Sequence, residues 1–170
     1  MVQIEYLPLV LTGLGLMASI LYYTMNLRNA NKTQQLALEN RRAQLYMQLF
    51  LRITSEDFMK RSIDLLRWNY SNLDEFFQKY NEDNKLAAKW ISQLWHIDGI
   101  GFLMSEGLIE PEMVYNFGGG QAHIRHWNKW KPIIEEMRSQ RSDPEFLKWF
   151  EYLSKQMKEL RIEKGLNDTP

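Results

Sequence analysis

The most distinct pattern in the chain is an apolar run near its start. Tyr6 to Leu27 are 22 consecutive residues without a charge, bounded by Glu5 and Arg28. At 1.5 Å per residue a helix of this length spans about 33 Å, whereas the hydrocarbon core of a bilayer is about 30 Å thick. The pattern therefore predicts one transmembrane helix within residues 1–27.

The residues around this run are of the kinds found at membrane surfaces. Tyrosine rings favour the interface, and basic side chains favour the cytoplasmic headgroups. The predicted interface residues are Tyr6, Tyr22, Tyr23, Arg28 and Lys32. Within the run, Gly15 and Ser19 form a small-xxx-small pair, a spacing that lets two transmembrane helices pack closely. We therefore expect helix–helix packing through this face.

The charge distribution predicts the topology. Between Arg28 and Arg52 there are five basic residues and one acid, whereas the remainder from Ile53 onward carries a net charge of −3. An excess of Lys and Arg marks the cytoplasmic flank, so we expect the N-terminus outside the cell and residues 28–170 in the cytoplasm. A cleavable signal peptide has its basic residues before the apolar run. Here they follow it, which favours an anchor in the cell membrane over a signal peptide. A buried core helix of this length without one charge is uncommon in a domain this small, which favours the anchor over that interpretation as well.

Helical periodicity recurs through the rest of the chain, and no segment shows a convincing strand pattern. Residues 29–53 are expected to continue the anchor helix, with the apolar segment 45–53 buried in the domain. Start and stop signals then predict further helices over 55–68, 73–80, 85–105, 112–117, from the glycine triplet 118–120 to about 141, and from Asp143-Pro144-Glu145 onward. Ser55, Ser71 or Asn72, and Asp143 are the expected N-caps.

Apolar stripes predict which faces are buried. In helix 85–105 the stripe comprises Trp90, Leu94, Ile97, Gly101 and Met104. Helix 55–68 has one of Met59, Ile63 and Leu66. The two helices after the triplet have stripes of Trp127, Trp130, Ile134 and Met137 and of Phe146, Trp149, Phe150, Leu153, Met157 and Leu160. All six tryptophans are expected in the core.

The predicted fold is all-α: an N-terminal transmembrane helix that continues into a compact cytoplasmic bundle of about five to six helices. The predicted divisions are the anchor (1–27), a juxtamembrane helix (28–44), the cytoplasmic helical domain (45–164) and a frayed tail (165–170). The composition is 45% hydrophobic and 25% charged, which is typical of globular chains. There is no cysteine, which excludes disulfides, thiolate metal sites and cysteine nucleophiles.

Few residues suggest chemistry. His123 and His126 are spaced i, i+3, so they could share a metal with Asp98 or Glu112 as third ligand. The competing interpretation is that both histidines pack beside the Trp127/Trp130 face. Asp98 is more readily explained by a structural contact with Arg125 or Lys131. The glycine triplet is not followed by the GK[ST] of a phosphate-binding loop, and the mildly acidic domain does not favour nucleic acid. No cofactor is expected.

The chain resembles a group of uncharacterised archaeal and bacterial single-pass membrane proteins, classed as a domain of unknown function. The similar segments are LYYTMNLRNANKTQQ (21–35), GIGFLMSEGLIEPEMVYNFGG (99–119), HWNKWKPIIEEMR (126–138) and DPEFLKWFEYL (143–153). The resemblance implies the architecture and carries no activity.

These features favour a membrane-anchored interaction module, an accessory subunit of a membrane complex, over an enzyme. Its expected partners are the lipid bilayer and either another protein or a second copy, bound through the transmembrane helix or the helical domain. The alternative is a membrane-bound metal-dependent enzyme that uses His123 and His126.

Overall fold

The computed structural model describes residues 7–116 and 120–166, and in these residues it has seven helices and no strand. The helices are α1 (Leu7–Ile53), α2 (Glu56–Arg67), α3 (Leu73–Glu82), α4 (Asn84–Ser105), α5 (Pro111–Tyr115), α6 (Gln121–Arg141) and α7 (Lys148–Glu163). The predicted all-α class is confirmed. Contacts divide the chain into two units, Met1–Gln44 and Leu45–Pro170.

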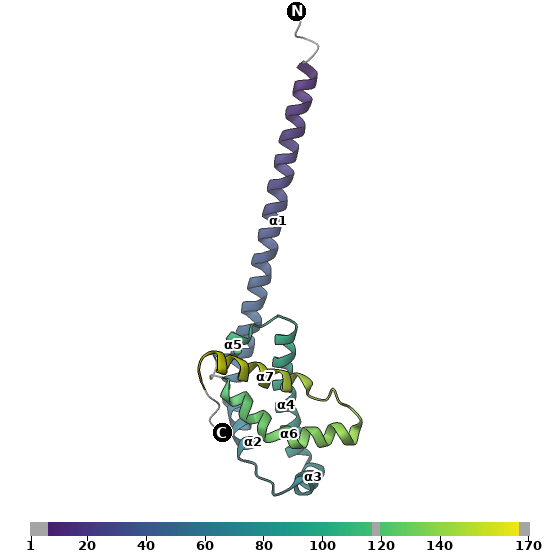
Figure 1. Cartoon of the computed structure of the whole chain (residues 1–170), viewed down its shortest axis with the longest axis vertical. Helices are drawn as coiled ribbons and strands as arrows, with labels where there is room; N and C mark the ends of the chain where they lie inside the picture. Colours follow the sequence, from purple (N-terminus) through teal and green to yellow (C-terminus); the bar gives the residue numbers. More distant parts are fainter. Residues whose placement is uncertain (1–6, 117–119, 167–170) are drawn as a thin grey trace, which may run out of the picture. The chain divides into compact units, whose positions relative to one another are not determined.

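The first helix, α1, contains all described residues of the apolar run and the basic stretch after it (Figure 1). Among the described residues it is the one helix long and apolar enough to cross a membrane. Its hydroxyl side chains bond within the helix: the Ser19 hydroxyl donates to the Gly15 carbonyl at 2.8 Å, and that of Thr12 to the Pro8 carbonyl. The polar groups of these two side chains are thereby satisfied without water.

The end of α1 differs from the prediction. Residues 45–53 were expected to be buried in the domain, but no described residue of α1 is buried. Leu49 and Ile53 pack against the core and stay half-buried, while Met47 and Leu51 are exposed. The sequence showed apolar residues on most sides of this segment, but the domain covers one side alone.

The caps of α2 and α3 follow local sequence signals. The Ser55 hydroxyl accepts from the Phe58 N–H at 3.3 Å, and the Asn72 side chain accepts from the Glu75 N–H at 2.9 Å. Both bonds satisfy a backbone donor that lacks a partner within its helix. The predicted caps are confirmed, with Asn72 rather than Ser71 in the second position.

The long helix α4 buries the predicted stripe, and Gly107 ends it in the left-handed conformation with φ +65°. All six tryptophans were expected in the core, but Trp68 and Trp149 are half-buried and Trp95 is exposed. Trp95 lies on the opposite face of α4 and is 62% exposed. Helical spacing groups side chains by face, but it does not say how many faces meet the core.

The helix α6 begins at Gln121, directly after the last glycine of the triplet, whereas Gly118 and Gly119 lie outside the described residues. Gly120 is the N-cap with φ +72°, and a Cβ built on it would lie 3.0 Å from Cβ of Met157. Glycine is therefore required there both by backbone conformation and by close packing. The helix continues through Pro132 to Arg141 and buries its predicted stripe.

The start of α7 is a second correction. Asp143-Pro144-Glu145 was predicted to open this helix, yet α7 begins at Lys148. The Asp143 side chain accepts from the Glu145 N–H at 3.1 Å, which makes a turn instead. Leu147 then precedes the helix with φ +55° and provides no side-chain cap.

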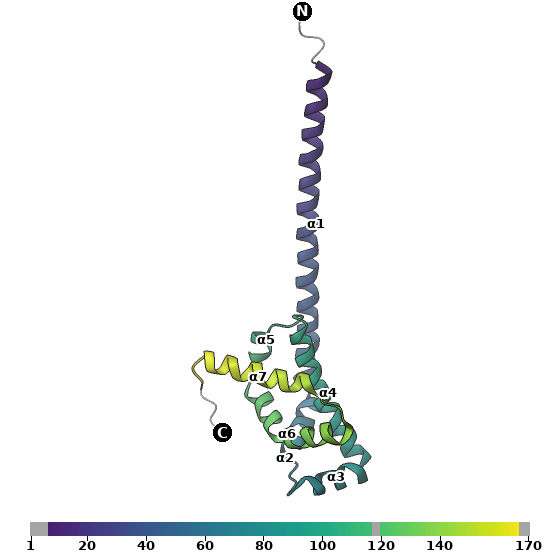
Figure 2. The ribbon, with the colours of Figure 1, turned by 45° about the vertical axis from the view of Figure 1, so that its right-hand side comes forward.

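The core of the second unit lies where α7 packs against α4 and α6 (Figures 1 and 2). The closest approach is at Gly101, where an added Cβ would lie 2.0 Å from the Trp149 carbonyl oxygen. At the other end of α4, Phe76, Trp90 and Trp130 form mutual aromatic contacts with centroids 5.4–6.0 Å apart. The predicted stripes of α4, α6 and α7 together form this core, and Trp149 is half-buried at its edge.

Candidate functional site: an apolar pocket beside two histidines

The second unit contains a pocket of about 260 Å³ between α2, α4 and the first turns of α6. One wall is formed by α2, the opposite wall by α6, and Ile53 and Ile97 close it from α1 and α4. The lining is mostly apolar, and its polar members are Ser62, His123, Arg125 and His126. A concave apolar surface with a few convergent polar groups is the usual form of a small-molecule site.

A lysine of α6 holds the α2 wall in place. Nζ of Lys129 donates to the carbonyl oxygens of Leu66 and Trp68, each at 2.6 Å, at the C-terminal end of α2. These carbonyls lack partners within their helix, so the charged donor satisfies them and complements the helix dipole. Burial lowers the pKa of Lys129, although its ordinary value is far above neutral. Through these two hydrogen bonds the Lys129 ammonium group holds the end of α2 against α6.

The two histidines are uncharged at neutral pH. Burial lowers the pKa of His123 to about 4 and that of His126 to about 4, the latter with further repulsion from His123, Arg125 and Lys129. His126 is 4% exposed, and its Nδ1 has no hydrogen-bond partner among the described residues. The usual cost of burying such an atom is met by a hydrogen bond, so this part of the pocket wall has an unused hydrogen-bonding group.

Ser62 contributes a second polar group. Its hydroxyl oxygen accepts from the buried Gln93 side-chain amide at 2.7 Å. Accepting through oxygen leaves the hydroxyl proton free to donate. Gln93 thus orients a hydrogen-bond donor in the lining of the pocket.

The structure places His123 and His126 together at this pocket but does not bring Asp98 to them. In the described ranges, no three or more His, Asp or Glu side chains are placed to hold a metal ion. Two imidazoles alone are fewer than the three protein ligands of usual catalytic zinc sites. Within the part of the chain that the structure describes, the metal-enzyme alternative therefore has no third ligand.

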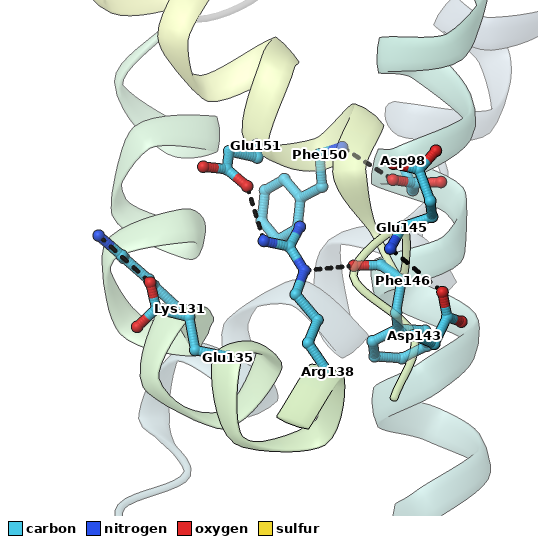
Figure 3. Close-up of polar contacts among 9 residues, drawn as sticks. All are labelled: Asp98, Lys131, Glu135, Arg138, Asp143, Glu145, Phe146, Phe150 and Glu151. Carbon is cyan, nitrogen blue, oxygen red and sulfur yellow. Dashed lines mark hydrogen bonds and ion pairs between the residues drawn. The ribbon is translucent and has the colours of Figure 1, made fainter. Parts of the chain in front are cut away.

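Asp98 has a different role, at the start of α7 (Figure 3). Its Oδ1 accepts from the Phe150 N–H at 2.8 Å, so its partner is neither Arg125 nor Lys131. Lys131 instead pairs with Glu135 at 3.5 Å. Burial raises the pKa of Asp98, against the opposing effects of the backbone N–H groups of Phe150 and Trp149.

Arg138 completes the polar contacts around α7. Its Nε donates to the Phe146 carbonyl at 2.9 Å and its Nη1 to Glu151 at 2.8 Å (Figure 3). The guanidinium thus joins the turn before α7 to the first turns of that helix. These contacts are structural, and they explain how Phe146 is fixed at the edge of the core.

The predicted membrane residues lie on α1. Tyr22 and Tyr23 are 71% and 65% exposed, and Arg28, Lys32, Gly15 and Ser19 are exposed as well. A Cβ on Gly15 would meet nothing within 4 Å. Tyr6 lies outside the described residues. The described members of this set are therefore open to their surroundings, and the Ser19 hydroxyl alone among them bonds within the helix, to Gly15.

The α2 wall of the pocket differs from the prediction, which placed Met59, Ile63 and Leu66 on the buried face of this helix. Met59 and Ile63 were recognised as a stripe of α2, but Phe58 and Leu65 make the buried contacts of this helix. Met59 and Ile63 are 48% and 42% exposed and line the pocket. The sequence contained a signal for this second apolar face. A helix that packs on a core by one face needs one apolar stripe, whereas α2 has two.

The comparison with protein families gives one match: the family described as "Domain of unknown function (DUF4760)" matches residues 9–157. The chain belongs to this family. The DUF4760 match covers most of α1, the whole pocket and most of α7, so the apolar segment and the helical domain are parts of one family unit. Comparisons with curated proteins and with solved structures found no match.

Proposed function

We propose that this DUF4760 protein is a single-pass membrane protein of archaeal or bacterial type, anchored by α1, and that its cytoplasmic helical domain is an interaction module of a larger membrane complex. The observation that carries the anchor is the uncharged run, of which no described side chain is buried by the chain itself. An exposed apolar helix of this length needs an apolar environment.

Two further observations support the anchor. Basic residues follow the run and acid precedes it, which fits an N-terminus outside and residues 28–170 in the cytoplasm. The family match begins at residue 9, inside the run. A removable signal sequence would not be expected to form part of a domain family, so this favours a retained anchor.

The interaction surface is proposed on the outer face of α4. Trp95 and Phe102 are 62% and 43% exposed, with Gly99 between them at helical spacing. A Cβ on Gly99 would meet nothing within 4 Å, so this face is open. Exposed tryptophan is enriched at the centres of protein interfaces. The partner is proposed to be another subunit at the membrane; a second copy that packs through Gly15 and Ser19 is the other possibility.

Co-purification tests the module. Full-length protein at native expression should be isolated in mild detergent, beside Trp95→Gln and a control, Ile162→Gln, whose residue is 68% exposed on α7. We expect a defined partner with wild type and with the α7 variant, and its loss with Trp95→Gln. A monomer without partner for the wild type would overturn the proposal.

Topology is tested separately by cysteine labelling in intact cells, which is straightforward because the chain has no native cysteine. Single cysteines placed at Thr169 and at Gln3 should react from inside and outside, respectively. Labelling of the C-terminal cysteine from outside would contradict the proposed orientation, and extraction of the protein without detergent would contradict the anchor.

A further inference from the structure

The pocket between α2 and α6 has an apolar side that the protein leaves uncovered. Met59 and Ile63 form its α2 wall and are 48% and 42% exposed, although they lie in a mostly apolar hollow. Each apolar group that leaves water gains roughly 25 cal/mol per Å² of buried surface. A ligand with an alkyl chain would cover both side chains.

The charge of the pocket favours an anion. Arg125 lines the pocket and is exposed, and none of the ion pairs among the described residues involves its guanidinium. The described residues that line the pocket include no acid, and both histidines are neutral at neutral pH. The described lining therefore carries a single positive charge, which matches a monovalent anionic head group.

Two hydrogen-bonding groups accompany this charge. His126 is almost fully buried and lines the pocket, its Nδ1 without a partner among the described residues, and the Ser62 hydroxyl has a proton to donate. Recognition sites for amphiphiles combine an apolar body with few placed polar groups. One cation, one hydroxyl and one imidazole suit a carboxyl group, and the hollow of about 260 Å³ suits one chain.

We propose that this pocket binds a medium-chain carboxylate of the fatty-acid class, with the alkyl chain along Met59 and Ile63 and the carboxylate at Arg125. The described lining comes from residues 53–126 alone. The inference therefore stands whether or not α1 crosses a bilayer.

Photolabelling tests the proposal because the labelled peptides show where the ligand lies. Ligand in the pocket therefore need not be physically separated from ligand in the membrane. Full-length protein in nanodiscs would be irradiated with dodecanoate carrying a terminal diazirine, and the labelled peptides identified by mass spectrometry. Dodecanol with the same diazirine is the uncharged comparison. Labelling of α1 peptides serves as the internal reference, because these apolar residues are exposed to any surrounding lipid.

Three variants sharpen the test. Ala122→Trp fills the pocket from a position that is exposed and lines it, and Ile63→Gln makes its wall polar. Arg125→Gln removes the cation, and its matched control is Lys131→Gln on the same helix, outside the pocket. Unfolding temperatures of all variants report whether each is folded.

We expect dodecanoate adducts on the α2 and α6 peptides of the wild type and of Lys131→Gln, and their loss in Ala122→Trp and Ile63→Gln at unchanged α1 labelling. In Arg125→Gln, labelling by the acid should fall roughly fivefold, as for loss of one partly solvated ion pair, while labelling by the alcohol stays the same. Absence of pocket adducts beside labelled α1 would overturn the proposal. Equal labelling by acid and alcohol, unaffected by Arg125→Gln, would overturn the carboxylate assignment.

Discussion

Oδ1 of Asp98 accepts a hydrogen bond from the N–H of Phe150 at 2.8 Å, so a residue in the middle of α4 caps the first turn of α7 from 52 positions earlier in the chain. Leu147, which precedes α7, has no side chain able to do this. The bond satisfies one of the free N–H groups at the helix start. It also fixes α7 against α4 at the place where Gly101 allows their close contact.

Substitution of Asp98 should show that its oxygen matters more than its charge. Asp98→Ala removes the acceptor and should lower the free energy of unfolding by about 1–2 kcal/mol, whereas Asp98→Asn keeps an acceptor of the same shape. Burial raises the pKa of Asp98 in the folded state, so the wild type loses stability as pH rises through that pKa. The stability of the Asn variant relative to wild type should therefore increase as pH rises above about 4, the ordinary pKa of an aspartate. Chemical denaturation followed by tryptophan fluorescence measures both effects, and an equally large loss in both variants would contradict this role.

Acidification should destabilise the domain through its buried histidines. The folded-state pKa of His126 is about 4, below its ordinary value of 6.5, so the unfolded state binds the proton first as pH falls. The contribution of neutral His126 to the free energy of unfolding is fully present above about pH 6.5 and is lost as pH falls to about 4. The largest loss expected from this group is roughly 3 kcal/mol.

The control for this pH dependence is His126→Gln, which cannot titrate. Melting temperatures of wild type and variant should be compared at about pH 7.5, 6 and 5, which span the ordinary titration range of histidine. The wild type should lose more between the first and last of these, while His123 continues to contribute in both proteins. Parallel curves would show that His126 is not buried in its neutral form.

Two glycines of α4 form a matched pair for packing. Gly101→Ala should destabilise the protein by about 3 kcal/mol or more, because the new Cβ would lie 2.0 Å from the backbone oxygen of Trp149, which cannot move alone. Gly99→Ala, half a turn earlier, meets nothing within 4 Å and should stabilise the helix by up to about 1 kcal/mol. Thermal unfolding followed by circular dichroism distinguishes the two, and equal effects would contradict the close approach of α4 and α7.

Lys129 should be the lysine of α6 on which stability depends. Lys129→Met removes the charged donor to the Leu66 and Trp68 carbonyls and should cost roughly 2–3 kcal/mol. Lys131→Met loses a solvated pair with Glu135 and should cost less than about 1 kcal/mol. Urea denaturation of the two variants makes the comparison. A similar small loss in both would mean that α2 is held by its apolar contacts alone.

Local signals in the sequence account for the helices that were predicted well. Ser55, Asn72 and Gly107 act on the backbone within a few residues, so their roles as caps and stop could be predicted from neighbours alone. The prediction for the start of α7 was wrong because this start depends on a residue that is not a neighbour in sequence. Asp143 has the local features of a cap, but the acceptor that starts the helix comes from Asp98, which is distant in sequence.

The candidate site shows the same limit. His123 and His126 were singled out by their spacing, and the structure places both at the pocket. The remaining lining was not predicted, because Ser62, Ile63 and Arg125 become neighbours only when α2 packs on α6. Helical spacing also could not show that Trp95 is exposed or that Met59 lines a pocket, since apolar residues on two faces of a helix look alike in sequence.

The sequence by itself determined the all-α class, the long apolar first helix and the stripes that form the core, because helical period and run length are properties of consecutive residues. Tertiary structure decided which side of α1 and α2 meets the core, where α7 starts and that a pocket remains beside the histidines. These depend on contacts between residues far apart in the chain, whose geometry follows from the packing of whole helices rather than from any local pattern.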